Sequence, residues 1–225
     1  MNLLAATLLV FRKDLRIELR SGEILITSGF FALLVAVLSS LSFYLDDVTA
    51  RRVAPGVLWI SIAFSGVLAM GRSFQRERDH DVFRGLLLSP LPRPAIFFGK
   101  MLGILAFLSL VELMLVPVVA VLYRLDLLAV WPRLGLLVLL GTLGFAAAGT
   151  LFAAMGVRTR TKELVLSVVL FPLISPALLA GVVATREVLG GASFGEMLDW
   201  VRVLVAFDLV LVTLGALLFG PLTSE

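Results

Sequence analysis

The chain has no cysteine and only one histidine among its 225 residues. Without cysteine it cannot form disulfide bonds, perform thiol redox chemistry or attach haem covalently through a Cys-x-x-Cys-His motif. With one histidine it cannot build the His-Glu-x-x-His zinc site, in which two histidines share one helix face. These absences predict that the chain itself binds no metal or other cofactor.

A phosphate-binding loop of the Walker A type is also missing. That motif needs a glycine five residues before a Gly-Lys pair, so that backbone N–H groups can surround the phosphate. The one Gly-Lys pair is Gly99-Lys100, where Pro94 stands five residues earlier and Met101 replaces the required Ser or Thr. If ATP hydrolysis drives this protein, a separate polypeptide must supply the nucleotide site.

Residues 191–195 match the Gly-x-Ser-x-Gly motif of hydrolases. The motif requires a strand-to-helix turn and a nearby histidine that activates the serine. Here it lies between two apolar segments, and His80 is expected on the opposite side of a membrane. We therefore expect a glycine-rich turn and no enzyme, with His80 solvated or against a partner rather than ligating a metal.

Charge is scarce: 16% of the residues are charged and 60% are hydrophobic, against about 25% and about 45–50% in globular proteins. Lipid must therefore solvate the outer surface. Apolar segments of about 20 residues, enough to cross about 30 Å of hydrocarbon, fill most of the chain. The sequence predicts an all-α integral membrane protein with one domain over residues 1–225. Its six predicted membrane-spanning helices cover 24–45, 53–71, 95–123, 134–157, 164–185 and 203–222.

The basic residues are distributed unevenly between the segments. Thirteen Lys and Arg residues lie before the first span, in the loop that follows the second span and at the start of the third, and in the loop after the fourth. The other loops contain six, mixed with acids. The positive-inside rule then places both termini in the cytoplasm and explains a pI near 9.8 without nucleic-acid binding. An aromatic belt is expected near the outer surface from Tyr44, Trp59, Tyr123, Trp131 and Trp200.

Residues 1–23 have the pattern of an amphipathic helix that lies on a membrane surface. Apolar side chains recur every three or four residues, at Leu4, Leu8, Phe11, Leu15 and Leu19. The basic residues take other faces, where they can meet anionic headgroups: Arg12, Lys13, Arg16 and Arg20. A poorly ordered basic tail is the alternative interpretation.

The loop between the second and third spans has the pattern of a short amphipathic helix over 73–89. An apolar stripe is expected from Phe74, Val82, Phe83, Leu86 and Leu87, beside the charged pair Glu77 and Arg78. Prolines at 90, 92 and 94 end the helix. Such a segment can dock into a groove of a soluble partner and transmit its movement to the spans; a solvated loop is the alternative.

Two acids lie near the middle of spans, Glu112 and Asp208. Ionisable groups are costly in hydrocarbon and commonly have a function there, as a polar hinge, a contact with a partner or a path for a polar substrate. A protonated group that neighbouring hydroxyls satisfy is the alternative. Pro172 and Pro176 predict a break in the fifth span.

Several runs of sequence resemble one family. The pattern Arg-x-Phe-x-x-Glu-Arg, followed by Gly-Leu-Leu-Leu-Ser-Pro and Ala-Ile-Phe-Phe-Gly-Lys, is similar to the coupling region of ABC-2-type permeases. Together with further runs, it resembles the CcmB family of haem exporter proteins over essentially the whole chain. One departure is Asp79-His80-Asp81, where many relatives have a glycine. The supporting runs are at 13–21, 54–59, 72–78, 85–90, 95–100, 111–113 and 171–173.

The resemblance implies an ABC-2-type permease bundle in the bacterial inner membrane, in two copies within a complex. The implied partners are a CcmA-like subunit that binds ATP and Mg, a haem-handling CcmC-like membrane protein, a small CcmD-like subunit and a CcmE-like periplasmic haem chaperone. Haem would reside on these partners, and this chain would contact membrane lipid but no nucleic acid. Two alternatives stay open: an exporter permease for a drug, lipid or polysaccharide, and a scaffold that relays motion without translocating anything.

Overall fold

The computed structural model describes residues 2–42, 47–79, 82–156 and 162–223, and these residues form helices without any strand. The helices are α1 (Leu3–Ser21), α2 (Glu23–Ser42), α3 (Asp47–Asp79), α4 (Val82–Leu88), α5 (Arg93–Leu122), α6 (Leu127–Gly156), α7 (Lys162–Leu189) and α8 (Phe194–Thr223). Within the described ranges six helices are long and apolar enough to cross a membrane, namely α2, α3 and α5 to α8. The predicted all-α bundle with six spans is confirmed.

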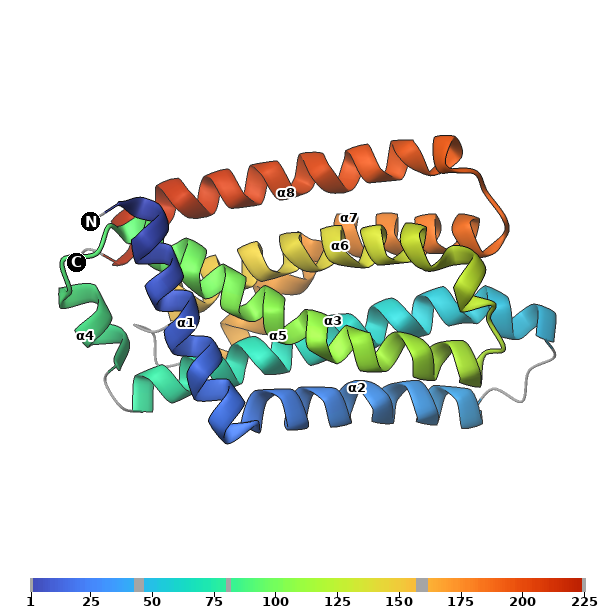
Figure 1. Cartoon of the computed structure of the whole chain (residues 1–225), viewed down its shortest axis with the longest axis horizontal. Coiled ribbons are helices and arrows are strands. Elements are labelled where there is room, and N and C mark those ends of the chain that lie inside the picture. Colours follow the sequence, from blue (N-terminus) through green and yellow to red (C-terminus); the bar gives the residue numbers. More distant parts are fainter. Residues whose placement is uncertain (1, 43–46, 80–81, 157–161, 224–225) are drawn as a thin grey trace.

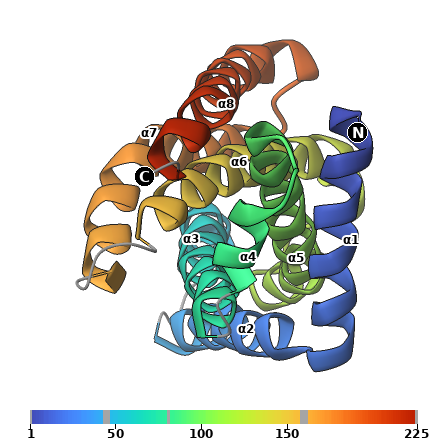
Figure 2. The same ribbon diagram turned by 90° about the vertical axis from the view of Figure 1, so that its left-hand side faces the viewer.

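The six long helices run side by side, while α1 lies across one end of them and α4 lies at that same end (Figure 1). Both chain termini are at this end, which we call the basic end. Viewed from the basic end, α6 occupies the interior, where it packs against α3, α5, α7 and α8 (Figure 2). The positions of the termini agree with an even number of crossings.

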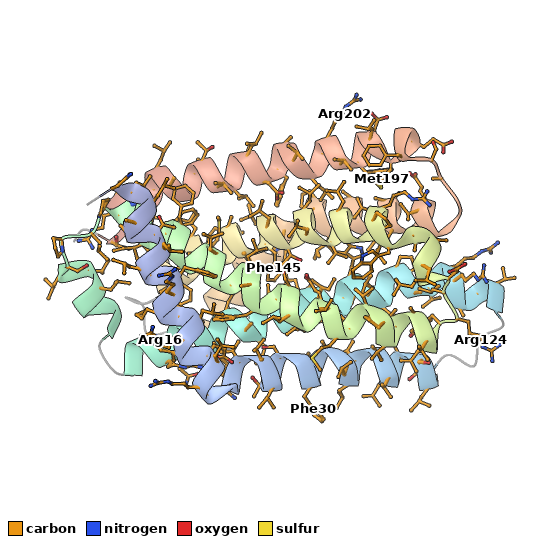
Figure 3. All side chains as sticks on the ribbon, in the orientation of Figure 1. Arg16, Phe30, Arg124, Phe145, Met197 and Arg202 are labelled. Carbon is orange, nitrogen blue, oxygen red and sulfur yellow. The ribbon has the colours of Figure 1, made fainter. Side chains whose placement is uncertain are left out.

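The outward faces of the two outermost helices are apolar. On α2 and α8 only 28% of the most apolar stretch is buried. Phe30 points away from the bundle on α2, whereas Phe145 fills the interior from α6 (Figure 3). Exposing these leucine, valine and phenylalanine side chains to water would cost free energy, and lipid tails solvate them instead.

Trp59 does not belong to the predicted aromatic belt. Its ring is 2% exposed and lies where α6 and α7 carry Gly141 and Gly181, at which any Cβ atom would collide with the indole. The indole Nε1 donates a 2.9 Å hydrogen bond to Thr185 Oγ1. The two glycines thus leave room for the indole ring, and the hydroxyl accepts a hydrogen bond from its N–H, so that this large ring can be buried. The position of Trp59 near the end of a predicted span does not indicate this burial.

The fifth span is one continuous helix, so the predicted break is wrong. α7 includes both Pro172 and Pro176. Pro176 has no N–H to donate to the carbonyl of Pro172, four residues earlier. The Ser175 hydroxyl donates to this carbonyl at 2.8 Å instead. A neighbouring serine can satisfy the freed backbone group in this way, and helices in membranes then tolerate proline.

The predicted glycine-rich turn before the last span is confirmed, with a turn at Gly190 and Gly191. Ser193 and Glu196 then form a reciprocal cap at the start of α8. The Ser193 N–H and hydroxyl donate to Glu196 Oε2 at 2.6 and 2.9 Å, and the Glu196 N–H points to Ser193 Oγ at 3.4 Å. The serine of the Gly-x-Ser-x-Gly match therefore starts a helix.

Candidate coupling site at the basic end

The helix α1 lies against the start of α5 through a face of small and acidic residues. Its buried positions are Ala6, Thr7, Val10, Asp14 and Glu18. α5 presents Gly99 to this face, and a Cβ atom there would lie 2.5 Å from Val10 Cβ and 3.0 Å from the Thr7 carbonyl oxygen. Glycine at position 99 therefore permits the close approach of the two helices.

Asp14 connects α1 to α5 by a buried ion pair. Lys100 Nζ lies 2.8 Å from Asp14 Oδ2, and the Lys100 side chain is only 1% exposed. Lys13 Nζ lies 2.9 Å from the other oxygen of Asp14. The Lys100 ammonium also lies 5.9 Å from the centre of the Phe74 ring on α3, within the range of a cation–π interaction.

Glu18 connects α1 to α2 and α3. One oxygen of its carboxylate accepts a hydrogen bond from Arg76 Nη2 at 2.9 Å, and the other accepts the Leu25 N–H at 2.9 Å. Arg76 also lies 3.7 Å from Glu23, which in turn lies 3.5 Å from Arg72. We call Asp14, Glu18, Arg76 and Lys100 the junction, because their side chains join four helices.

The described part of the predicted coupling helix over 73–89 is divided between two helices, and residues 80 and 81 between them lie outside the described residues. Residues 73–79 continue α3, and α4 is a separate helix of seven residues, Val82–Leu88. The helix of the second predicted span continues beyond Gly71 to Asp79, and two arginines of this extension, Arg72 and Arg76, are engaged by acids of α1 and α2. A charged segment that follows a span can therefore extend its helix.

The predicted coupling residues separate into two groups. Phe74 is buried in the main core, so its ring does not contribute to an outer docking surface. Leu86 and Leu87 of α4 are half-buried against the same core, while Leu88 is 82% exposed. The side chains of Glu77, Arg78, Val82 and Phe83 lie outside those that the structure describes, and their docking role stays a prediction.

The N-terminal segment is helical, as predicted, and its outward face is both apolar and basic. Leu4, Leu8 and Leu19 are exposed, whereas Phe11 and Leu15 are half-buried. Arg12, Arg16 and Arg20 are exposed and Lys13 is half-buried beside Asp14 (Arg16 is labelled in Figure 3). This surface fits a helix at a lipid headgroup layer, which stays a prediction.

The acids of the junction were missed from the sequence, although a signal was present. Asp14 and Glu18 are four residues apart, so they share one face of a helix. Among the residues that the structure describes, no group of three or more His, Asp or Glu side chains could hold a metal ion. The ion pairs and hydrogen bonds of the junction connect α1 to α2, α3 and α5.

The two intramembrane acids are about as buried as each other but differ in their contacts. Glu112 is 5% exposed and its Oε1 accepts a hydrogen bond from the Thr142 hydroxyl of α6. Asp208 is also 5% exposed, and its carboxyl group is packed against Gly144 without a hydrogen bond to any side chain described here. Glu112 therefore fits the interpretation of a carboxyl group satisfied in part by a hydroxyl.

Comparison with known proteins identifies the family. The family model described as CcmB protein matches residues 5–221. The heme exporter protein B of Bradyrhizobium diazoefficiens is 28% identical over 207 residues, which cover 92% of this chain and 91% of that protein. The protein of the same name from Paracoccus denitrificans is 31% identical over 180 residues, 80% and 82% of the two chains. The one from Escherichia coli K12 is 31% identical over 94 residues, 42% and 43% of the chains. The chain therefore belongs to the CcmB protein family and is a multi-pass protein of the bacterial inner membrane.

Proposed function

We propose that this chain is the permease subunit of an ABC transporter that exports or handles haem for cytochrome c biogenesis. Its membership in a family whose named relatives are heme exporter proteins supports this role. The lack of a Walker A motif supports a division of labour in which a CcmA-like partner binds ATP and Mg. The chain is then a transporter subunit rather than a catalytic enzyme.

The observation that supports coupling most directly is the junction. α4 rests on the main core through Leu86 and Leu87, close in sequence to the end of α3. α3 is tied to Glu18 of α1 through Arg76, and α1 is tied to α5 through Asp14 and Lys100. A push on α4 from a partner would therefore reach the core through Leu86 and Leu87, and the polar contacts of the junction would pass a movement of α3 on to α1 and α5.

In this proposal the basic end faces the cytoplasm, as the excess of basic residues predicts. Closure of the ATP-binding partner would move α4 and the end of α3 together. The bundle would then change the surface that it offers to CcmC-like and CcmD-like membrane partners, and haem would pass to a CcmE-like chaperone. Haem would be held by these partners, since the chain has one histidine and no cysteine for axial ligation.

The test compares exposed leucines at the two ends of the molecule. Leu88 is 82% exposed at the tip of α4, and Leu128 is 93% exposed at the start of α6, at the end opposite the basic end. Three single variants, Leu88→Asp, Glu77→Ala and Phe83→Ala, should each still purify as the complete complex. In each of them, most of the cytochrome c assembly per ATP hydrolysed should be lost. Leu128→Asp should leave that ratio unchanged.

Two measurements are needed, ATP hydrolysis by the purified complex and the amount of haem-containing cytochrome c in cells. An unchanged ratio in Leu88→Asp, Glu77→Ala and Phe83→Ala would refute coupling through α4. Copurification with the ATP-binding subunit should persist in both the Leu88 and the Leu128 variants, so that a changed ratio reports lost coupling rather than lost assembly of the complex. An optical spectrum of the purified chain without its partners should show no bound haem.

A further inference from the structure

A cavity of about 250 Å³ lies between α5 and α6 and opens to the side of the bundle. Glu112 of α5 and Trp131 and Leu139 of α6 are among its lining residues. Leu113, Trp131 and Leu139 are 58%, 45% and 49% exposed, so the opening lies on the lipid-facing surface. Residues 131 to 139 span about 12 Å of helix, and the cavity therefore runs along α6 as a groove.

Glu112 lies in this groove and is 5% exposed. The Thr142 hydroxyl bonds to Oε1, and no ion pair to Glu112 occurs among the side chains that the structure describes. Glu112 lies ten residues, or about 15 Å, from the outer end of α5 at Leu122. A carboxyl group at this depth is costly unless it meets a basic group or a hydrogen-bond donor.

The wall of the groove permits the close approach of another backbone. At Gly135 on α6 a Cβ atom would meet nothing within 4 Å, although the residue lines the cavity. Small residues at exposed positions of membrane helices are typical of helix–helix contacts. Asp208 differs in this respect, because its carboxyl group lies against Gly144 of α6 and the residue is 5% exposed.

The volume of the groove and the depth of Glu112 in the membrane limit which kinds of molecule can occupy the groove. Its volume of about 250 Å³ is below the range of about 300–1,000 Å³ that is usual for small-molecule sites, but it accommodates a large side chain. A cationic lipid headgroup would remain at the membrane surface, far from Glu112. A second copy of this chain is a poor source of the cation, because the basic residues well inside its spanning helices are engaged within their own chain: Lys100 with Asp14, Arg133 with the Ala192 carbonyl and Arg202 with Asp199.

We propose that the groove between α5 and α6 receives a transmembrane helix of a different polypeptide, whose basic side chain reaches Glu112 at mid-membrane. The groove would surround this side chain with Leu113 and Leu139, and Gly135 would face the backbone of the incoming helix. The pairing selects a partner by charge at a depth where charges are rare. This inference does not depend on coupling through α4, and either can fail without the other.

Cross-linking in membranes tests the contact, since the chain has no cysteine of its own. Leu113→Cys and Leu139→Cys would each be treated with a photoactivatable thiol reagent in membranes that contain the complete transporter. Met114→Cys is the matched control, because Met114 is 62% exposed on the same helix but lies about 200° around it from Glu112. We expect adducts with one other membrane polypeptide at positions 113 and 139 and not at 114.

The charge of Glu112 is then tested within the same assay. Glu112→Lys should abolish the adduct at 113, Glu112→Gln should weaken it, and changing the basic residue of the cross-linked helix to Glu should restore it in the Glu112→Lys chain. The proposal is overturned by adducts with lipid alone, by adducts with a second copy of this chain, or by equal adducts at 113 and 114. It is also overturned if the Glu112→Gln chain, purified intact, cross-links as strongly as the unchanged chain.

Discussion

Lys100 Nζ and Asp14 Oδ2 are 2.8 Å apart, and these side chains are only 1% and 9% exposed. The pair joins a helix that lies across the end of the bundle to a helix that spans it. Its position explains why a lysine can stand near the start of an apolar span, since the charge is compensated by an acid from a segment 86 positions earlier in the chain.

Removing one member of the buried pair should destabilise the protein. Lys100→Met leaves Asp14 with Lys13 alone, and breaking a buried ion pair from one side costs about 3–5 kcal/mol. The double variant Lys100→Met with Asp14→Asn should recover part of the loss. Thermal unfolding in detergent measures both effects. The control is Arg202→Ala, which removes an equally short pair with Asp199 (2.8 Å, side chains 71% and 83% exposed) and should change little.

The two glycines under α1 should respond differently to alanine. At Gly99 a Cβ atom would lie 2.5 Å from Val10 Cβ, whereas at Gly103 the nearest atom, Asp14 Cβ, would be 3.5 Å away. Gly99→Ala should therefore push α1 from α5 and destabilise by about 1–3 kcal/mol, while Gly103→Ala should be close to neutral. Limited proteolysis of α1 together with thermal unfolding reports the difference. Equal stability and equal protease sensitivity of the two variants would contradict the observed packing of α1 against α5.

The two arginines at the end of α3 offer a second matched pair. Arg76→Gln leaves the Glu18 carboxylate, 1% exposed, without its cationic partner, and we expect a clear loss of stability. Arg72→Gln affects a pair with Glu23 at 3.5 Å whose side chains are 44% and 49% exposed, and such surface pairs contribute little. Under the proposed coupling, Arg76→Gln should also lower cytochrome c assembly per ATP, measured at a temperature where the variant is folded. Similar values for both variants would show that the junction transmits nothing.

The contribution of the buried hydrogen bond between Trp59 and Thr185 to stability should be measurable by substituting the two side chains. Thr185→Val keeps the shape but leaves the indole N–H without its acceptor, at a cost of about 1 kcal/mol. Thr185→Ser should restore most of the stability because the hydroxyl is retained. Trp59→Phe combined with Thr185→Val should cost less than the sum of the two changes. Strict additivity in this thermal-unfolding cycle would mean that the 2.9 Å contact has no energetic value.

Helix content and number of spans follow from local sequence properties. The apolar segments between charges predicted six spans because each run is long enough for the hydrocarbon and every backbone group must be bonded within its own segment. Helix ends were less predictable. α3 reaches Asp79, and acids from other helices engage its arginines. α7 continues through Pro172 and Pro176, and Ser175 bonds to the carbonyl that Pro176 leaves free.

The candidate sites, too, have some features that follow from local sequence and others that depend on contacts between helices. The sequence alone identified an amphipathic N-terminal helix, a polar segment between the second and third spans, and acids at Glu112 and Asp208, because these depend on composition and helical periodicity. Only the tertiary structure decided that Phe74 faces inward, that Asp14 meets Lys100, that Glu112 lines an open groove and that the carboxyl oxygens of Asp208 are buried without a hydrogen bond to any residue that the structure describes. Those relations join residues far apart in the chain, and the packing of one helix on another determines them.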